Sequence, residues 1–296
     1  MSWSRSIPLE SRAQGFAILA GMAAEHAVTW QDYLAELPPV QQQAIRETKN
    51  PPHLFSVISW GRAATTWLAH VLNSHPDIFC LHASNHVWRD LGGARDLDGV
   101  RYLQIVRAMG RTCLAAGDVH GVGRDRIPEL RAAYGSEFSA AALVRDPMAR
   151  IASQMAFFEN YAEHDWGIAY IDKMIEYHQL DLPDQEYPTK FFVHAVNMLN
   201  AIDEEVRICK VFRQEDITTD PMSLKALVAE LTAGKVSPTE AWYEQAVGTR
   251  PINVFPRTRP ILVPQDWQLH VLRKVVTPSA WKIYEELGYP VPAFLK

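Results

Sequence analysis

The sequence predicts an α/β protein in which two layers of helices cover a central parallel β-sheet, a three-layer α/β/α fold. Three observations support this prediction. Predicted strands and helices alternate along most of the 296-residue chain. The predicted strands are apolar almost throughout, which is typical of parallel strands that helices cover on both faces. The composition, 48% hydrophobic and 21% charged, provides ample apolar material for a core.

Short apolar runs bounded by turn residues predict the strands, and the segments between them predict helices. We expect five strands, at Leu54–Ser59, Ile78–His82, Cys113–Val119, Phe138–Val144 and Val206–Phe212. We expect helices between them at Thr65–Asn73, Val100–Met109, Arg126–Tyr134 and Pro147–Tyr161, with more helix up to about Ile202, broken near Pro183 and Pro188. The residues after the last strand are predicted to form helices and loops.

Capping residues mark several of the predicted helix ends. Asp146 can cap the helix that Pro147 begins, since proline suits the first helical position. Ser237 and Glu240 form a capping-box pattern. Gly288 is expected to end the last helix of the chain.

Residues 1–50 are predicted to form an N-terminal helical extension, which Pro51–Pro52 separates from an α/β domain at 51–296. The apolar run Phe16–Ala24 fits an amphipathic helix better than a signal peptide, because acidic residues flank it. No apolar stretch reaches the length of a membrane span. The three cysteines lie in apolar runs without metal-ligand spacing, so we expect buried, reduced thiols and a cytoplasmic protein.

The formal net charge of −5 argues against a broad basic surface for nucleic acid. A local basic pocket is compatible with this charge, and the stretch Ser59–Thr66 predicts one. It joins a predicted strand to a helix whose first amides have no helical partner and attract anions. Arg62 adds a fixed positive charge, and Thr65 and Thr66 add hydroxyl donors. These residues favour a phosphate site, with a plain strand–helix turn and a surface arginine as the alternative.

This corner matches the phosphate-binding loop of ATP-binding proteins, G-x-x-x-x-G-K-[ST], only in part. With Arg62 at the lysine position, Gly61 fits the pattern. Ser56 stands where the first glycine belongs, and Ala63 stands where the magnesium-binding hydroxyl belongs. We therefore expect a P-loop NTPase-like fold that binds an anionic donor without a metal.

A second corner of the same kind lies at "VRDPMARIASQ". Arg145 ends a predicted strand, and Ser153 follows eight residues later on the next helix. The two side chains can therefore converge on a second phosphate. Arg150 lies between them and could assist, although taken alone it is predicted to be solvated.

Together the two corners resemble the sulfotransferases that use 3′-phosphoadenosine 5′-phosphosulfate (PAPS). The first corner of that family reads roughly K/R-S-G-T-T-W-L, and it is matched here by "RAATTWL" at Arg62–Leu68. Its second corner is R-[ND]-P with a serine at the same eight-residue distance. The segments Val211–Pro221 and Trp267–Tyr289 resemble two later motifs of the family. The matches run in family order from about residue 54 to residue 289.

The resemblance implies PAPS as co-substrate, 3′,5′-ADP as product and no required metal. It places the 5′-phosphosulfate on the first corner, where Arg62 would also stabilise the leaving phosphate, and the 3′-phosphate on the second. The implied nucleotide contacts are Arg62, Ala63, Ala64, Thr65, Thr66, Trp67, Arg145 and Ser153, with Arg257 and Arg259 as two candidates for a further contact with the 3′-phosphate. Trp67 would flank the adenine, fill the core, or do both. Ala63 and Ala64 replace the family's Ser-Gly, and a helical backbone at Ala64 would cost little.

Sulfuryl transfer to a hydroxyl needs a group that accepts the hydroxyl proton. Many family members use a histidine at a strand end between the two corners, and His120 has this placement, 25 residues before Arg145. His82 and His86 close another predicted strand and are the rivals for this role. Either could instead line the acceptor pocket. Asp118 could orient the imidazole of His120, raise its pKa or face solvent.

In the family, the region after the second corner borders the acceptor pocket. Here it is rich in aromatic side chains, among them Phe157, Phe158 and Tyr161, which suits a small-molecule or lipid-like hydroxyl acceptor. An ordinary helical core is the alternative for these side chains. The sequence leaves open whether the chain forms a homo-oligomer.

Two other functions stay open on the sequence alone. One is a P-loop kinase or NTPase, in which Asp118 would be the magnesium carboxylate. The other is a non-catalytic relative that binds the nucleotide and uses its N-terminal helices as an interaction surface.

Overall fold

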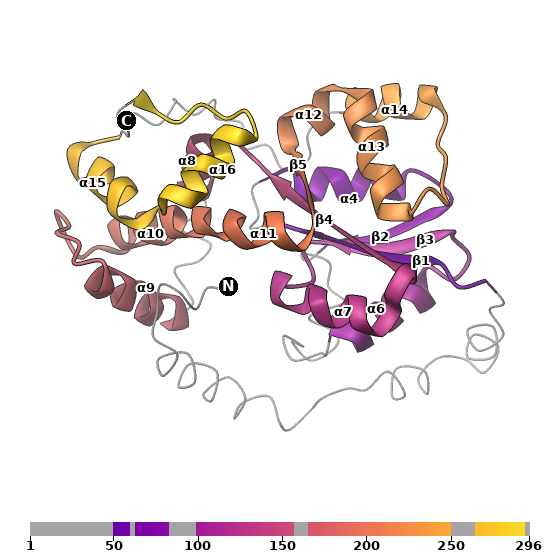
Figure 1. Ribbon diagram of the computed structural model, residues 1–296, viewed down its shortest axis with the longest axis horizontal. Coiled ribbons are helices and arrows are strands. Elements are labelled where there is room, and N and C mark those ends of the chain that lie inside the picture. Colours follow the sequence, from indigo (N-terminus) through magenta and orange to yellow (C-terminus); the bar gives the residue numbers. More distant parts are fainter. Residues whose placement is uncertain (1–49, 60–62, 83–98, 157–164, 250–263, 294–296) are drawn as a thin grey trace. The chain divides into compact units, whose positions relative to one another are not determined.

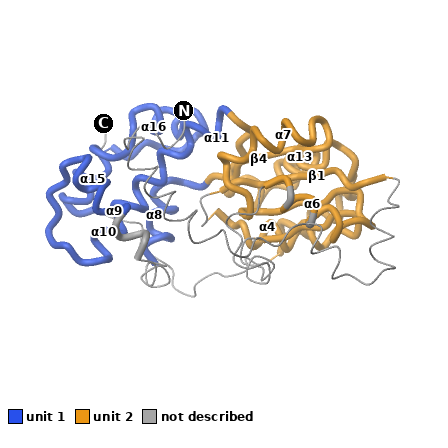
Figure 2. The backbone as a smooth tube through the Cα atoms, turned by 90° about the horizontal axis from the view of Figure 1, so that it is seen from below, with its two compact units in different colours: residues 1–11, 145–207, 255–296 blue, residues 12–144, 208–254 orange. Residues whose placement is uncertain are grey.

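The fold is described from a computed structural model, which describes residues 50–59, 63–82, 99–156, 165–249 and 264–293. The chain divides into two compact units (Figure 2). The sheet unit comprises residues 12–144 and 208–254, and the helical unit comprises residues 1–11, 145–207 and 255–296. The predicted N-terminal extension lies outside the described residues, so the boundary at residue 50 stays a prediction.

The described residues of the sheet unit form five parallel strands, which confirms the predicted parallel sheet. They are β1 (His53–Ile58), β2 (Ile78–His82), β3 (Ala115–Val119), β4 (Phe138–Val144) and β5 (Lys210–Arg213). Their order across the sheet is β2-β3-β1-β4-β5, and every neighbouring pair is parallel. The first strand is therefore central, and the connections leave it on both sides. In such sheets, ligands bind beyond the carboxyl ends of the strands where the strand order changes direction.

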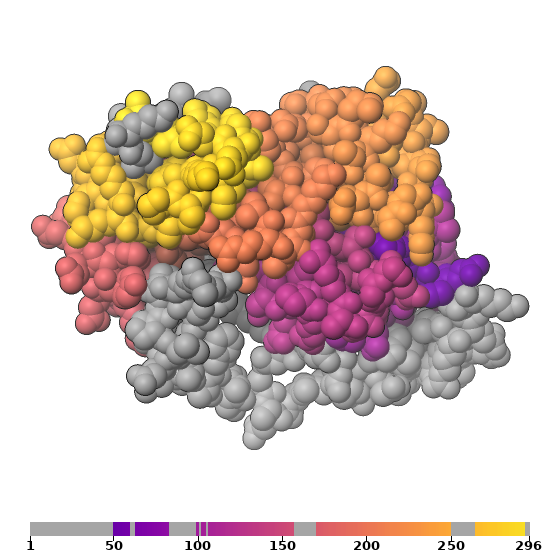
Figure 3. Space-filling model, viewed as in Figure 1, coloured from indigo at the N-terminus to yellow at the C-terminus, as the bar shows by residue number. Residues whose placement is uncertain are grey.

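Helices cover both faces of the sheet. They are α4 (Thr65–Asn73), α12 (Gln214–Thr219), α13 (Pro221–Thr232) and α14 (Glu240–Val247) together with α6 (Gly99–Met109) and α7 (Ile127–Tyr134). In Figure 1, α4 and α13 lie on one side of the strands, whereas α6 and α7 lie on the other. The side chains of α13 and α14, in orange, and of α6 and α7, in magenta, hide most of the sheet on the face that Figure 3 shows. The predicted three-layer architecture is confirmed.

The two faces of the central strand enter different cores. Phe55 and Val57 pack with α4 and α13, whereas Leu54 and Ile58 pack with α6 and α7. All six residues of β1 are buried. Side chains alternate along a strand, so Ser56 points to the same side as Leu54 and Ile58, the side of α6 and α7. A strand that is buried on both faces needs the continuous apolar run that the sequence shows.

The helical unit contains no strand among its described residues. Its helices are α8 (Pro147–Met155), α9 (Asp165–Tyr177), α10 (Tyr187–Asn197), α11 (Ile202–Ile208), α15 (Asp266–Val275) and α16 (Pro278–Glu286). The predicted cap of α8 is confirmed, because Asp146 Oδ1 accepts a hydrogen bond from the Ala149 amide at 2.7 Å. Gly288 follows α16 with a left-handed backbone at φ 83°, as expected for a helix-ending glycine.

Several local predictions were wrong. β3 begins at Ala115 rather than Cys113, and α8 ends at Met155 rather than Tyr161. The last strand begins at Lys210 rather than Val206, because residues 206–208 end α11. The cap of α14 is Thr239, whose side chain accepts from the Trp242 amide, rather than Ser237. The predicted break near Pro183 and Pro188 is confirmed, because α9 ends at Tyr177 and α10 begins at Tyr187, with Pro188 in its first turn.

The cysteines differ in burial. Cys80 is buried as expected, whereas Cys113 and Cys209 are only half-buried. Among the described helices, none is long and apolar enough to cross a membrane.

A buried histidine at the start of β1 predicts a loss of stability in mild acid. Burial, with the charges of Lys235 and Arg107, lowers the pKa of His53 to about 4, and Nε2 shares a hydrogen bond with Ser139 Oγ at 2.9 Å. Between pH 6.5 and pH 4 the unfolded chain binds a proton at this histidine and the folded chain does not, so the free energy of unfolding decreases as the pH falls. We expect His53→Gln to reduce the loss between pH 6.5 and pH 5 by about 1 kcal/mol, as measured by urea unfolding. An equal loss in both proteins would contradict this assignment.

Candidate functional site

Three corners of the sheet unit lie at the carboxyl ends of adjacent strands. β1 leads to α4, β2 ends at His82, and β3 is followed directly by His120. β3 lies between β1 and β2, and all three strands are parallel. Their carboxyl ends therefore meet at one edge of the sheet, which brings residues far apart in the sequence into one site.

The start of α4 presents unpaired backbone donors. Ala64 is the residue before the helix, and no side chain caps the helix among the described residues. The first helical hydrogen bond runs from the Leu68 amide to the Ala64 carbonyl at 2.9 Å, so the amides of the first turn have no partner inside the helix. Such a helix start favours an anion.

The backbone of Ala64 differs from the sequence prediction. It has a φ of 55° and a ψ of 28°, which is left-handed and not the inexpensive helical conformation that we expected. For a residue with a Cβ atom this conformation costs roughly 1–2 kcal/mol, and glycine avoids the cost. The corner is therefore strained where the resembling family has glycine.

His82 contacts the threonines of α4. The side chain is 9% exposed, and its Nε2 lies 3.0 Å from Thr65 Oγ1 and 3.5 Å from Thr66 Oγ1. Burial, and the charge of His120 to a lesser degree, lowers the pKa of His82 to about 4, so the ring is neutral at pH 7. When Nε2 carries the ring proton and donates it to Thr65, the hydroxyl hydrogen of Thr65 can be donated to an anion.

His120 is held by its backbone and by its ring. Its amide donates to the Val57 carbonyl at 2.8 Å, and its φ of 68° is left-handed. Ring Nδ1 forms a hydrogen bond with the Ser59 carbonyl oxygen. Because a carbonyl oxygen can only accept a hydrogen bond, Nδ1 is the donor and carries the ring hydrogen. In the neutral ring Nε2 therefore holds the lone pair and can act as a base. The ring centroids of His82 and His120 are 6.3 Å apart.

Asp118 is fully buried and does not face solvent, which removes one of the three roles that the sequence left open. Its Oδ2 accepts hydrogen bonds from the Gly121 and Val122 amides. Burial raises the pKa of Asp118 to about 7, and the Ser56 hydroxyl and the two amides offset only part of this effect. The Asp118 side chain is thus hydrogen-bonded to the backbone of the two residues that follow His120.

The residues of the second corner lie in the helical unit. Arg145 and Ser153 are both half-buried, with Arg145 directly before the capping residue of α8 and Ser153 within the helix. The first corner lies in the sheet unit, so the convergence of the two corners on one nucleotide stays a prediction.

The prediction of a solvated Arg150 was wrong. This side chain on α8 is only 7% exposed. Burial, and to a lesser degree the positive charge of Arg150, lowers the pKa of His194 to about 4. Burial also raises the pKa of Tyr284 to about 12, and the charge of Arg150 offsets part of this rise. Arg150 therefore belongs to a buried polar cluster of the helical unit. The residues that enclose it come from α10 and α16, which a local sequence pattern does not reveal.

Trp67 takes the structural role that the sequence left open. It is 2% exposed and belongs to the core between the sheet and α4. Its contact with adenine stays a prediction. Seven further predicted site residues lie outside the described residues: Arg62, His86, Phe157, Phe158, Tyr161, Arg257 and Arg259.

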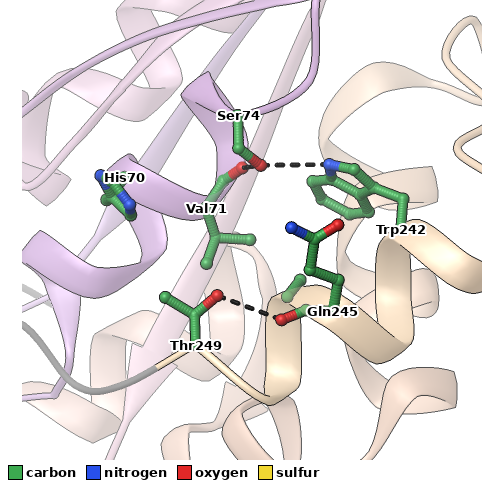
Figure 4. A pocket seen from close by; sticks show the side chains of 7 residues that line it. His70, Val71, Ser74, Trp242, Gln245 and Thr249 are labelled. Atoms are coloured by element: carbon green, nitrogen blue, oxygen red, sulfur yellow. Dashed lines mark hydrogen bonds between the residues drawn. The ribbon is translucent and has the colours of Figure 1, made fainter.

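A shallow pocket lies at the other end of α4 (Figure 4). His70, Val71 and Ser74 line it from α4 and the residue after it, and Trp242 and Gln245 line it from α14. The Trp242 indole donates to Ser74 Oγ at 3.1 Å, which links the two segments across the pocket. This pocket is separated from the Thr65 end of the helix and is not the predicted nucleotide site.

The described residues contain no group of three or more His, Cys, Asp or Glu side chains that could hold a metal ion. No family model matches the chain, and no curated protein matches it. Among solved structures, a sulfotransferase from Alicyclobacillus acidocaldarius is similar with a TM-score of 0.45 and 16% sequence identity, over 83% of this chain and 99% of that chain. This similarity is too low to carry a function from one chain to the other, so the function is inferred from the side chains.

The strain at Ala64 predicts that glycine stabilises this position. We expect Ala64→Gly to raise the free energy of unfolding by up to about 1 kcal/mol, because glycine adopts a φ of 55° without the Cβ clash. Urea unfolding measures the effect. Ala233→Gly is a positive control, since Ala233 is also left-handed at φ 49°, and Ala132→Gly on the exposed face of α7 should destabilise by about 1 kcal/mol. A loss of stability in Ala64→Gly as large as that in Ala132→Gly would show that Ala64 is not strained.

Proposed function

We propose that this chain transfers a sulfuryl group from PAPS to a hydroxyl of a small-molecule or lipid-like acceptor and releases 3′,5′-ADP. The observation that supports this most is the arrangement at the strand ends of the sheet unit. There, the uncapped start of α4 with Thr65 and Thr66 provides donors for an anion, and His120 has a base at Nε2. Donors for an anion and a base for a hydroxyl proton are the two functions that sulfuryl transfer needs from a protein.

The first corner would bind the 5′-phosphosulfate. The amides that begin α4, the hydroxyls of Thr65 and Thr66, and the guanidinium of Arg62 are its donors. His82 would donate Nε2–H to Thr65, so that the Thr65 hydroxyl donates to an anion oxygen. Arg145 and Ser153, with Arg257 or Arg259, would bind the 3′-phosphate. Phe157, Phe158 and Tyr161, with His82 or His86, are the proposed acceptor contacts.

His120 would act as the general base. As the acceptor oxygen attacks sulfur, one S–O bond forms and the S–O bond to the 5′-phosphate breaks, while the hydroxyl proton passes to Nε2. The Ser59 carbonyl holds Nδ1–H throughout and stabilises the imidazolium. Arg62 and the first amides of α4 would stabilise the negative charge that develops on the 5′-phosphate as 3′,5′-ADP leaves.

The environment of Asp118 disfavours a kinase or NTPase. That function needs a carboxylate that can reach a magnesium ion. Asp118 is fully buried, and its Oδ2 is occupied by two backbone amides. A carboxylate whose pKa burial has raised to about 7 is also a poor ligand for a divalent cation.

Nucleotide binding without metal is the first test. We expect 3′,5′-ADP to bind with the same dissociation constant, within about twofold, in EDTA and in magnesium chloride, because the donors are amides, hydroxyls and arginines. Isothermal titration calorimetry measures both constants. Binding that requires magnesium, or tighter binding of ATP, would support the kinase. Binding of 3′,5′-ADP without transfer from PAPS to any of a panel of alcohols, phenols and amines would support the non-catalytic relative.

The role of His120 predicts a separation of turnover from binding. We expect His120→Ala to lower kcat on the order of 10²–10⁴-fold, the usual contribution of a general base. The affinity for 3′,5′-ADP should stay within about threefold, since the ring acts on the acceptor. His70→Ala, an exposed histidine on α4, is the matched control and should leave kcat unchanged. Near-normal turnover of His120→Ala would transfer the role to His82 or His86.

A further inference from the structure

We propose that Asp118 is a positioning residue that holds His120 in the geometry of a base. The proposal rests on the proposed function where it concerns catalysis, and on the geometry alone where it concerns the orientation of the ring. Asp118 lies two residues before His120, at the carboxyl end of β3.

Asp118 binds the backbone on the far side of His120. Its Oδ2 accepts from the amides of Gly121 and Val122, the two residues that follow His120. A single carboxylate oxygen thus closes a tight turn around His120. The Asp118 side chain itself is fixed, because it is fully buried on β3 next to Ser56, its partner in the strand register.

The turn leaves no space for a side chain after His120. A Cβ atom added to Gly121 would lie 2.2 Å from Asp118 Oδ2 and 2.8 Å from the Tyr102 hydroxyl. Only glycine permits the carboxylate to approach the backbone this closely. The hydrogen bonds of Asp118 to this turn therefore depend on glycine at position 121.

This turn compensates an unfavourable backbone at His120. A left-handed residue with a Cβ atom costs roughly 1–2 kcal/mol, so the φ of 68° persists only if neighbouring interactions favour it. The His120 amide donates a hydrogen bond to the Val57 carbonyl. The amides of the next two residues, Gly121 and Val122, donate hydrogen bonds to Asp118 Oδ2. The left-handed backbone is thereby held from both sides.

The backbone of His120 in turn sets the direction of its ring. Nδ1–H reaches the Ser59 carbonyl at the end of β1, which directs the lone pair of Nε2 away from this carbonyl. If the turn relaxed toward an ordinary backbone, the ring would leave Ser59 and the tautomer would no longer be selected. The loss would appear in the chemical step and not in nucleotide binding.

Two substitutions at Asp118 separate hydrogen bonding from charge. Asp118→Asn keeps an oxygen that accepts both amides and removes the charge, whereas Asp118→Ala removes the acceptor. Asp220 is the matched control in the same unit, because its carboxylate also accepts two backbone amides, those of Met222 and Ser223, at the start of α13. Asp220→Ala should lower stability and leave the His120 ring and kcat unchanged.

The readout of the ring is ¹H–¹⁵N NMR of the histidine side chains, with the His120 signals assigned by comparison with His120→Gln. We expect a slowly exchanging Nδ1–H of His120 in the unmodified protein and in Asp118→Asn, and its loss in Asp118→Ala. We expect kcat to fall at least about tenfold in Asp118→Ala and to stay within about threefold in Asp118→Asn, with the affinity for 3′,5′-ADP unchanged in both.

Two outcomes would overturn the proposal. One is an intact Nδ1–H signal in Asp118→Ala. The other is a loss of kcat in Asp118→Asn that is as large as in Asp118→Ala, while Asp118→Asn keeps the Nδ1–H signal of His120. That result would assign the loss of kcat to the charge of Asp118 and not to its hydrogen bonds. If Asp118→Ala does not fold, Gly121→Ala tests the same contact from the other side, because the added Cβ displaces Asp118 Oδ2. The NMR result stands even if no sulfuryl transfer is found, so a failure of the proposed function is distinguishable from a failure of the positioning role.

Discussion

The hydrogen bond from the His120 amide to the Val57 carbonyl is the interaction on which the candidate site depends. It is a ladder hydrogen bond of the last register pair of β1 and β3, Val57 with Val119, because a residue in a parallel pair bonds to the residues on either side of its partner. Because β1 is central and its carboxyl end leads into α4, this one bond places His120 beside the exit of β1. Without the parallel register of β1 and β3, a histidine after β3 and a helix after β1 would be unrelated features of the surface.

The sequence was sufficient for the sheet because its signals are local. Continuous apolar runs mark strands that are buried on both faces, and Asp146 caps α8 in both the pattern and the structure. The errors arose where distant residues decide. Residues 206–208 have an apolar pattern that fits a strand, yet they end α11. Arg150 follows a helical pattern that fits solvent, but Tyr284 and His194, far away in the sequence, lie close to it in the buried cluster.

The candidate site was predictable as a set of residue types and not as a set of contacts. Threonines at a helix start and histidines at strand ends are visible in the sequence. The contact of His82 with Thr65 is not, since it requires β2 to pair with β3 and to end level with α4. The left-handed backbones of Ala64 and His120 are likewise hidden, because neither residue is one that usually adopts this conformation without support. Ala64 directly precedes α4 and His120 directly follows β3, and backbone strain is concentrated at functional sites in many proteins.

The two histidines have different environments, and the difference divides their roles. Burial lowers the pKa of His82 most, and the charge of His120 lowers it further. The ring centroids of the two histidines lie 6.3 Å apart, close enough for this charge effect on His82. His82 is buried against Thr65 and stays neutral, which suits a residue that sets the direction of a hydroxyl donor. His120 has its hydrogen fixed at Nδ1 by a carbonyl, which leaves Nε2 as the nitrogen that can accept a proton. Under the proposed function, the pair would combine a neutral ring that orients a hydroxyl donor with a ring that accepts the hydroxyl proton at Nε2.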